Sequence, residues 1–352
     1  MIRILIPSLS FFTQHLSPLL LPAFVKVNLR TNFLDLTLVV IVLSFTLIAS
    51  RTVLSTDFPI SLLLAELKPL TLLAAVFLVG RVRTTLSPSL SQNLLERKFL
   101  ETVRAYAWTF IILSLVVTLY VAAIMGGPII RAIDYFEVKS DLVSTYQSAI
   151  ACLLYILLKG NTRLRIGLLV TIGLAGSGIG YIGLISYYIF PLRLRIKNWI
   201  FITLLVIAIL QTADYRGYAL SEWLQNNTRT AILSAYLSSM TISTLLIGGG
   251  LTTPLKSDFI GPIRDPEIVS YILSESASGA VYSTILHSDL LRFTATYGCI
   301  CLIVFLFLLS RQLKGTAVAF PTLIMGVIGG CLYSTGYILL VILTIAFHRN
   351  QI

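Results

Sequence analysis

Apolar runs of about membrane length recur along nearly the whole chain. A run of about 20 apolar residues matches the roughly 30 Å hydrocarbon core of a bilayer when it forms a helix. The pattern therefore predicts an all-α, polytopic integral membrane protein with about ten transmembrane helices. The candidate spans are 33–50, 59–80, 103–127, 143–159, 166–190, 198–213, 297–310, 316–330 and 333–347, with 4–24 as a further candidate.

Composition supports the membrane class and excludes a soluble globular protein. The chain has 352 residues, of which 57% are hydrophobic and only 12% charged, against roughly 25% charged residues in soluble domains. Its formal net charge of +11 does not indicate nucleic-acid binding, because cytoplasmic loops of membrane proteins collect Lys and Arg. The cysteines fall in apolar segments at spacings that match no metal-ligand pattern, so we interpret them as packing or lipid-facing residues: Cys152, Cys299, Cys301 and Cys331.

Basic connections predict which side of the membrane each loop occupies. By the positive-inside rule, four of them should face the cytoplasm, which requires an even number of crossings within 166–190. That stretch is only about one bilayer long, and its centre reads Gly176-Ser177-Gly178-Ile179-Gly180, so we expect two half-helices that meet there. The alternative is a single straight helix whose small residues pack against a neighbour. The orientation of 1–50 stays open. The basic connections are 81–98, 159–165, 191–197 and 311–314.

The same topology makes residues 214–296 one long external, periplasmic segment between membrane helices in 1–213 and in 297–352. The segment holds five basic and seven acidic residues, a net charge of −2, so the rest of the chain carries +13. This asymmetry agrees with the predicted orientation. Apolar periodicity within the segment predicts helices over 229–247 and 268–291, joined by turns at Gly248-Gly249-Gly250 and Gly261-Pro262.

Several polar residues of the external segment are candidates for chemistry. His287 has the side chain whose pKa lies nearest neutrality, which suits a general base, although a lone histidine is more often structural. Arg229, Arg264 and Arg292 suit a phosphate because guanidinium groups bind oxyanions bidentately, and solvated charges or ion pairs are the plainer alternative. Asp265-Pro266-Glu267 is better explained as a polar turn than as a metal site, so we expect no metal.

Four features occur in a fixed order along this segment: Arg229 in a helix, Gly248-Gly249-Gly250, His287-Ser288-Asp289-Leu290-Leu291, and Tyr297-Gly298 at the start of the next span. In this order and topology the run resembles the O-antigen polymerase and O-antigen ligase superfamily of bacterial envelope glycosyltransferases. Two features of that family are absent here. The arginine often found at the bend near Gly178 is missing, and Leu233 stands where a tryptophan often follows the loop arginine.

The resemblance implies a metal-independent, inverting glycosyl transfer between lipid-linked sugars at the outer face of the bacterial inner (plasma) membrane, without a cofactor. It implies His287 as base or acceptor-orienting group, Asp289 as its partner, and Arg229 as the leading pyrophosphate contact. Arg264, Arg292 and Tyr282 are further substrate-binding candidates. The implied partners are an undecaprenyl-pyrophosphate-linked oligosaccharide, membrane lipids, a chain-length regulator and a flippase, with no nucleic acid.

Three alternatives stay open at this point. The favoured function is a polymerase of O-antigen or exopolysaccharide, and an O-antigen ligase is the nearest alternative because the two branches overlap in their motifs. A secondary transporter or flippase would explain the glycine-interrupted helices and the ionisable Glu66 and Lys68 within span 59–80, but the chain shows no internal repeat. A non-catalytic component of envelope assembly is the third possibility.

Overall fold

The described residues of the computed structural model form helices and no strands. They comprise 88–125, 144–175, 177–189, 196–215, 228–250, 255, 260, 269, 281, 286, 288–329, 331–334, 336–338, 340–342 and 344–345. The helices are α5 (Pro88–Met125), α7 (Ser144–Leu157), α8 (Thr162–Leu174), α9 (Gly178–Ile189), α10 (Ile196–Tyr215), α12 (Thr228–Ser239), α13 (Ile242–Ile247), α15 (Asp289–Leu313) and α16 (Ala319–Ile328), with a 3₁₀ turn η6 (Cys331–Tyr333).

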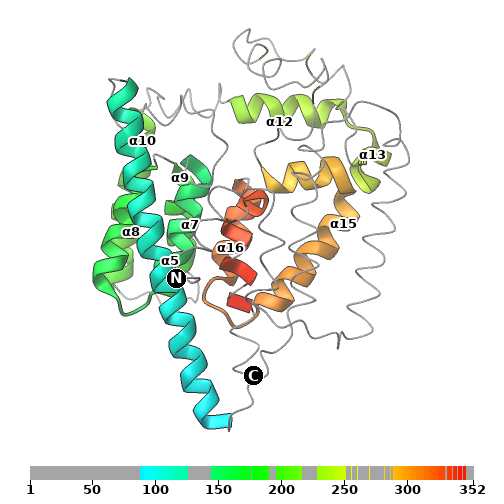
Figure 1. Cartoon of the computed structure of the whole chain (residues 1–352). Helices are drawn as coiled ribbons and strands as arrows, with labels where there is room; N and C mark the ends of the chain where they lie inside the picture. Colours follow the sequence, from blue (N-terminus) through cyan, green and yellow to red (C-terminus); the bar gives the residue numbers. More distant parts are fainter. Residues whose placement is uncertain are drawn as a thin grey trace.

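The helices form an upright bundle with a thin layer across one end. In Figure 1, α5, α7, α8, α9, α10 and α16 run roughly along one direction, whereas α12 lies across the top of the bundle and α13 lies beside the bend of α15. The layer has a small core of its own, where Ile232, Ala235 and Tyr236 of α12 pack with Val281, Leu286 and Ala295. Because Ala295 belongs to α15, this second core joins the layer to the bundle.

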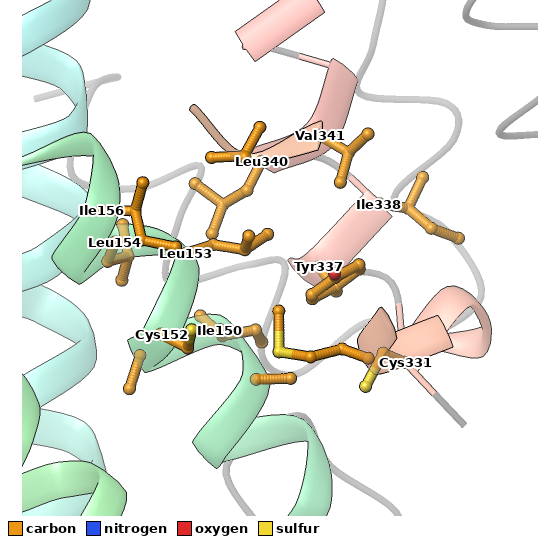
Figure 2. Packing of buried hydrophobic residues seen from close by; sticks show 14 of the residues in the cluster. Ile150, Cys152, Leu153, Leu154, Ile156, Cys331, Tyr337, Ile338, Leu340 and Val341 are labelled. Atoms are coloured by element: carbon orange, nitrogen blue, oxygen red, sulfur yellow. The ribbon is translucent and has the colours of Figure 1, made fainter. Parts of the chain in front are cut away.

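Helix α7 is the central element of the bundle. Every residue from Gln147 to Ile156 is buried, and a helix that is apolar on all sides belongs inside a bundle. Figure 2 shows Ile150, Cys152 and Leu153 of α7 close to the C-terminal segment that carries Tyr337 and Val341. The surrounding helices α5, α8, α9 and α16 all pack against α7.

The predicted break inside 166–190 is confirmed. Helix α8 ends at Leu174, and α9 begins at Gly178. The break is held by Ser148 of α7, whose hydroxyl donates to the Ser177 carbonyl oxygen and accepts from the Gly180 amide, at 3.1 and 2.9 Å. The single straight helix is therefore wrong, but its small residues do pack closely: a Cβ on Gly183 would lie 2.7 Å from the Cys152 sulfur.

Most predicted spans within the described residues coincide with helices, and the differences lie at their ends. Helix α5 begins at Pro88, inside the connection predicted for 81–98, and proline suits the first helical turn. The helix expected over 229–247 is two helices, because Thr241 caps a new one by accepting from the Thr244 amide. The helix expected over 268–291 is also wrong at its end, since 281, 286 and 288 are not helical. Spans 4–24, 33–50 and 59–80 lie outside the described residues.

Two helical stretches in the described part, Phe99–Tyr120 and Leu290–Leu313, are long and apolar enough to cross a membrane. Shorter apolar helices of 10 to 17 residues accompany them. Helix α5 also turns large apolar side chains away from the core, at positions about one turn apart: Trp108, Ile112, Val116 and Leu119. Contiguous exposed apolar side chains of this kind mark contact with lipid or with another protein.

The close approach of α9 to α7 predicts a destabilised variant. In Gly180→Ala the added Cβ would lie 2.6 Å from the backbone oxygen of Ser148, so the helices must separate. We expect a loss of about 1–3 kcal/mol in the free energy of unfolding, measured by denaturation in detergent micelles. Gly178→Ala is the matched control, because its Cβ would meet nothing within 4 Å. Equal stability of the two variants would contradict this packing.

Candidate functional site

Helix α15 bends at the Tyr297-Gly298 pair, which the sequence placed at the start of a span. Gly298 has φ 81° and ψ 164°, outside the helical region, whereas helix surrounds it on both sides. It divides α15 into an N-terminal arm, 289–297, and a C-terminal arm, 299–313. Glycine adopts a positive φ without the steric penalty of a side chain. Two helical segments therefore meet at the aromatic-Gly pair, and the C-terminal one begins directly after it, as the sequence predicted.

The Gly248-Gly249-Gly250 turn docks onto this bend through backbone contacts, an arrangement that we call the glycine clamp (residues 246–250 against 295–298). The Gly249 and Gly250 amides donate to the Ala295 and Thr296 carbonyl oxygens, at 2.7 and 3.0 Å. Carbonyl oxygens in the last turn before a helix break have no helical amide to bind. The Gly249 and Gly250 amides take the place of those donors. A Cβ on Gly248 would lie 2.5 Å from the Thr296 oxygen, and one on Gly298 would collide with the Leu246 backbone.

Arg292 lies on the N-terminal arm and is buried, with 8% of its surface exposed. Its guanidinium carbon stacks 3.7 Å from the centre of the Tyr333 ring. Among the residues that the structure describes, its buried Nε and Nη2 atoms have no hydrogen-bond partner. These two nitrogens form one edge of the guanidinium fork, the edge that binds a carboxylate or phosphate bidentately. A buried charge with unsatisfied donors is costly, so an anion bound at this edge would stabilise the site.

A narrow apolar crevice adjoins the arginine. It lies between the two arms of α15, helix α16 and η6, and Tyr333 lines it while also carrying the guanidinium of Arg292. The bend at Gly298 sets the angle between the arms and so shapes the crevice. A charged fork beside an apolar crevice suits an amphiphile with an anionic head. The other lining residues are Leu290, Phe293, Leu302, Phe305, Leu306, Leu309, Leu323, Gly326, Val327 and Leu332.

The segment that leads into α15 is tied to the last turn of α16. The Ser288 hydroxyl donates to the Val327 carbonyl oxygen at 2.6 Å. This bond fixes the backbone one residue after His287 and four residues before Arg292. Gly329, two residues after Val327, lies against Ile179 in the first turn of α9. The site is therefore at the end of the bundle where α8 and α9 meet.

The structure describes the predicted site residues unequally. Of the six, only Arg292 has a described side chain. Arg229 stands in the first turn of α12, one turn before the buried Ile232, and Asp289 is the first residue of α15. His287, Tyr282 and Arg264 lie outside the described residues. In the described part, no group of three or more His, Cys, Asp or Glu side chains is placed to hold a metal.

Sequence reasoning missed the partners of Arg292 because they come from distant parts of the chain. Tyr333 stands at the start of an apolar run, and nothing in its neighbours marks it as the residue on which an arginine stacks.

In the layer formed by α12, burial raises the pKa of the Tyr236 hydroxyl above its ordinary value, so this side chain stays neutral. Tyr236 therefore supports α12 as an apolar packing residue.

A second arginine–tyrosine cluster lies at the opposite end of α7. Arg165 stacks 3.9 Å from the centre of the Tyr155 ring, and its Nη2 donates to the Tyr188 hydroxyl at 3.0 Å. The Tyr155 and Tyr188 hydroxyls are 2.9 Å apart and hydrogen-bonded. Within the described residues, Nε is the one nitrogen of this guanidinium that is buried without a partner. The cluster thus ties α7, α8 and α9 together, and its fork is already partly satisfied.

Comparisons of the chain with protein-family models, with curated proteins and with solved structures give no significant match.

The glycine clamp predicts that a side chain at position 298 disrupts the backbone hydrogen bonds of Gly249 and Gly250. In Gly298→Ala the side chain would collide with the backbone at Leu246, in addition to the strain of a positive φ, about 1–2 kcal/mol. We expect the Gly249 and Gly250 amides to lose their protection from hydrogen exchange.

Gly160→Ala separates the two causes, because Gly160 has φ 100° but nothing within 4 Å of its added Cβ. This control should show the strain alone and leave exchange at Gly249 and Gly250 unchanged. Full protection of both amides in Gly298→Ala would contradict the clamp.

Proposed function

We propose that the protein polymerises a surface polysaccharide, O-antigen or exopolysaccharide, by transferring a glycan from undecaprenyl pyrophosphate to the acceptor sugar of another lipid-linked repeat unit. The observation that carries the proposal is the buried Arg292 beside an apolar crevice, with two fork nitrogens that no described residue satisfies. A pyrophosphate supplies the oxyanion that the fork lacks, and the apolar side chains of the narrow crevice offer a surface that a polyprenyl chain can contact.

Neighbouring motif residues supply the other groups that this transfer needs. The acceptor hydroxyl attacks the anomeric carbon of the donor sugar, the bond to the pyrophosphate oxygen breaks, and the configuration at that carbon inverts. His287 takes the hydroxyl proton, with Asp289 as its partner. Arg229 and Arg292 stabilise the negative charge that grows on the departing pyrophosphate, and Arg264 and Tyr282 bind substrate. Pyrophosphate is already a good leaving group, so positioning and charge stabilisation suffice without a metal.

The positions of these residues in the described part are compatible with one site. Ser288 anchors the backbone between His287 and Asp289 to α16, and Arg292 follows one turn of α15 after Ser288. The layer formed by α12 packs onto the same N-terminal arm through Ala295. Arg229, at the start of α12, thus belongs to an element that contacts the arm of Arg292.

We place this site at the outer face of the bacterial inner membrane, in a chain with about ten spans and 214–296 outside. The two long apolar helices support the membrane location. The exposed apolar side chains on α5 and on the C-terminal arm of α15, among them Ile303 and Phe307, are suited to face lipid. The basic connections support the orientation.

The proposal predicts the outcome of removing the base. In His287→Ala the producing cell should lose long surface polysaccharide and accumulate single lipid-linked repeat units, because the acceptor hydroxyl keeps its proton. Polysaccharide length is followed by gel electrophoresis, with His348→Ala as the control that removes another of the three histidines. Long chains that stay unattached to lipid A-core would indicate a ligase instead. Unchanged polysaccharide in His287→Ala would exclude both functions.

The fork predicts a second variant. Arg292→Lys keeps the charge but loses the paired nitrogens, so polymer formation should fall about tenfold to a hundredfold, the value of one or two charged hydrogen bonds. Arg165→Lys is the matched control, since that guanidinium also stacks on a tyrosine but already donates to Tyr188. It should lower thermal stability and leave activity per folded molecule unchanged. Wild-type activity in Arg292→Lys, or an equal loss in both variants, would count against pyrophosphate binding at the fork.

A further inference from the structure

Helix α13 exposes all of its large apolar side chains. Ile242 is 78% exposed, and Leu245, Leu246 and Ile247 are each about 40% exposed. No residue of this helix is buried, although it belongs to the segment predicted to lie outside the membrane. Leu237, on the neighbouring α12, is 53% exposed and extends the apolar surface. A contiguous apolar surface in water is unfavourable, and such a patch marks a surface that something covers.

The sequence around α13 is unlike the rest of the external segment. Between Arg229 and Lys256 there is no charged residue, whereas acidic and basic residues are spread through the other parts of 214–296. The polar residues of this stretch are mainly Ser and Thr, which leave the apolar surface uncharged. Uncharged composition combined with exposed leucines and isoleucines suits contact with a bilayer better than with bulk water.

The position of α13 indicates what covers its apolar face. The glycine clamp holds it against the bend of α15 through backbone hydrogen bonds, and Figure 1 shows it at the flank of the molecule beside that bend. The C-terminal arm of α15 continues from the bend with its own outward apolar side chains, Ile303 at 66% and Phe307 at 54% exposed. Helix α13 therefore lies at the end of the arm whose outward side chains we assign to lipid.

We propose that α13 is an interfacial membrane anchor, with its apolar side chains inserted among the acyl chains of the outer leaflet. The proposal rests on the membrane location of α15 given under the proposed function, and it is independent of the glycosyl transfer. The bilayer covers the surface made by Leu237, Ile242 and Leu245, and the Ser and Thr residues stay at headgroup level. Insertion of α13 holds the glycine clamp, and with it the α12 layer, at the membrane surface.

Spin labels measure this placement directly. The full chain is reconstituted into phosphatidylcholine nanodiscs with a nitroxide on Ile242→Cys, and its accessibility to oxygen and to a water-soluble nickel chelate is compared. Phe307→Cys is the lipid-facing reference. Lys159→Cys is the aqueous reference, because Lys159 is an exposed charged residue at the turn between α7 and α8. Label on the native cysteines, three of which are buried, is measured on the unsubstituted chain and subtracted.

The expected result is that the Ile242 label resembles the Phe307 label, with high exposure to oxygen and low exposure to the nickel chelate. If Phe307 behaves as lipid-facing but Ile242 resembles Lys159, the anchor is overturned while the membrane location stands. If Phe307 also resembles Lys159, the membrane location itself fails and the anchor with it. A label at Ile242 that is shielded from both reagents and shows dipolar broadening between chains would overturn the proposal in favour of contact between two copies.

Discussion

The backbone contact between two glycine-containing segments is the constraint on which the site end of the molecule depends. Gly249 and Gly250 donate to the carbonyl oxygens of Ala295 and Thr296, and these contacts are close enough to exclude a side chain on Gly248 or Gly298. One interaction thereby bends α15, joins the outer layer to the bundle and sets α13 at its flank. Backbone hydrogen bonds have narrow geometry, so this junction holds its parts in one arrangement.

The bend matters because it places a charge and an apolar surface side by side. The N-terminal arm carries Arg292 over Tyr333, and the space between the arms is lined by leucines and phenylalanines. A guanidinium with two unsatisfied buried donors is poorly placed unless an anion arrives. A lipid with a phosphate head would satisfy the donors while its chain contacts the apolar surface beside them, which is why we favour a lipid pyrophosphate as the ligand.

The two arginine–tyrosine clusters, Arg165 on Tyr155 and Arg292 on Tyr333, make similar contacts but differ in role. Arg165 has a partner in Tyr188 and joins three helices that follow one another along the chain. Arg292 joins α15 to η6, and both donors of one fork edge lack a partner in the described part of the chain. The partly satisfied cluster at Arg165 contributes to the stability of the bundle, whereas the fork of Arg292 is open to a ligand. Charge and residue type alone do not separate these roles, since both residues are arginines stacked on tyrosine.

Periodicity and loop charge were enough to predict the helical class, the position of most described spans and the break between α8 and α9, because each depends on neighbours along the chain. The same reasoning placed Arg292 among the candidates and Tyr297-Gly298 at the start of a helical segment, but it did not predict the second helical segment that precedes this pair. Only the tertiary structure decided that Gly248 to Gly250 meet that bend, that Arg292 is buried on Tyr333, and that α13 is left exposed. These features arise from packing between segments that are far apart in sequence. The residues around a glycine do not indicate which distant backbone segment it will contact.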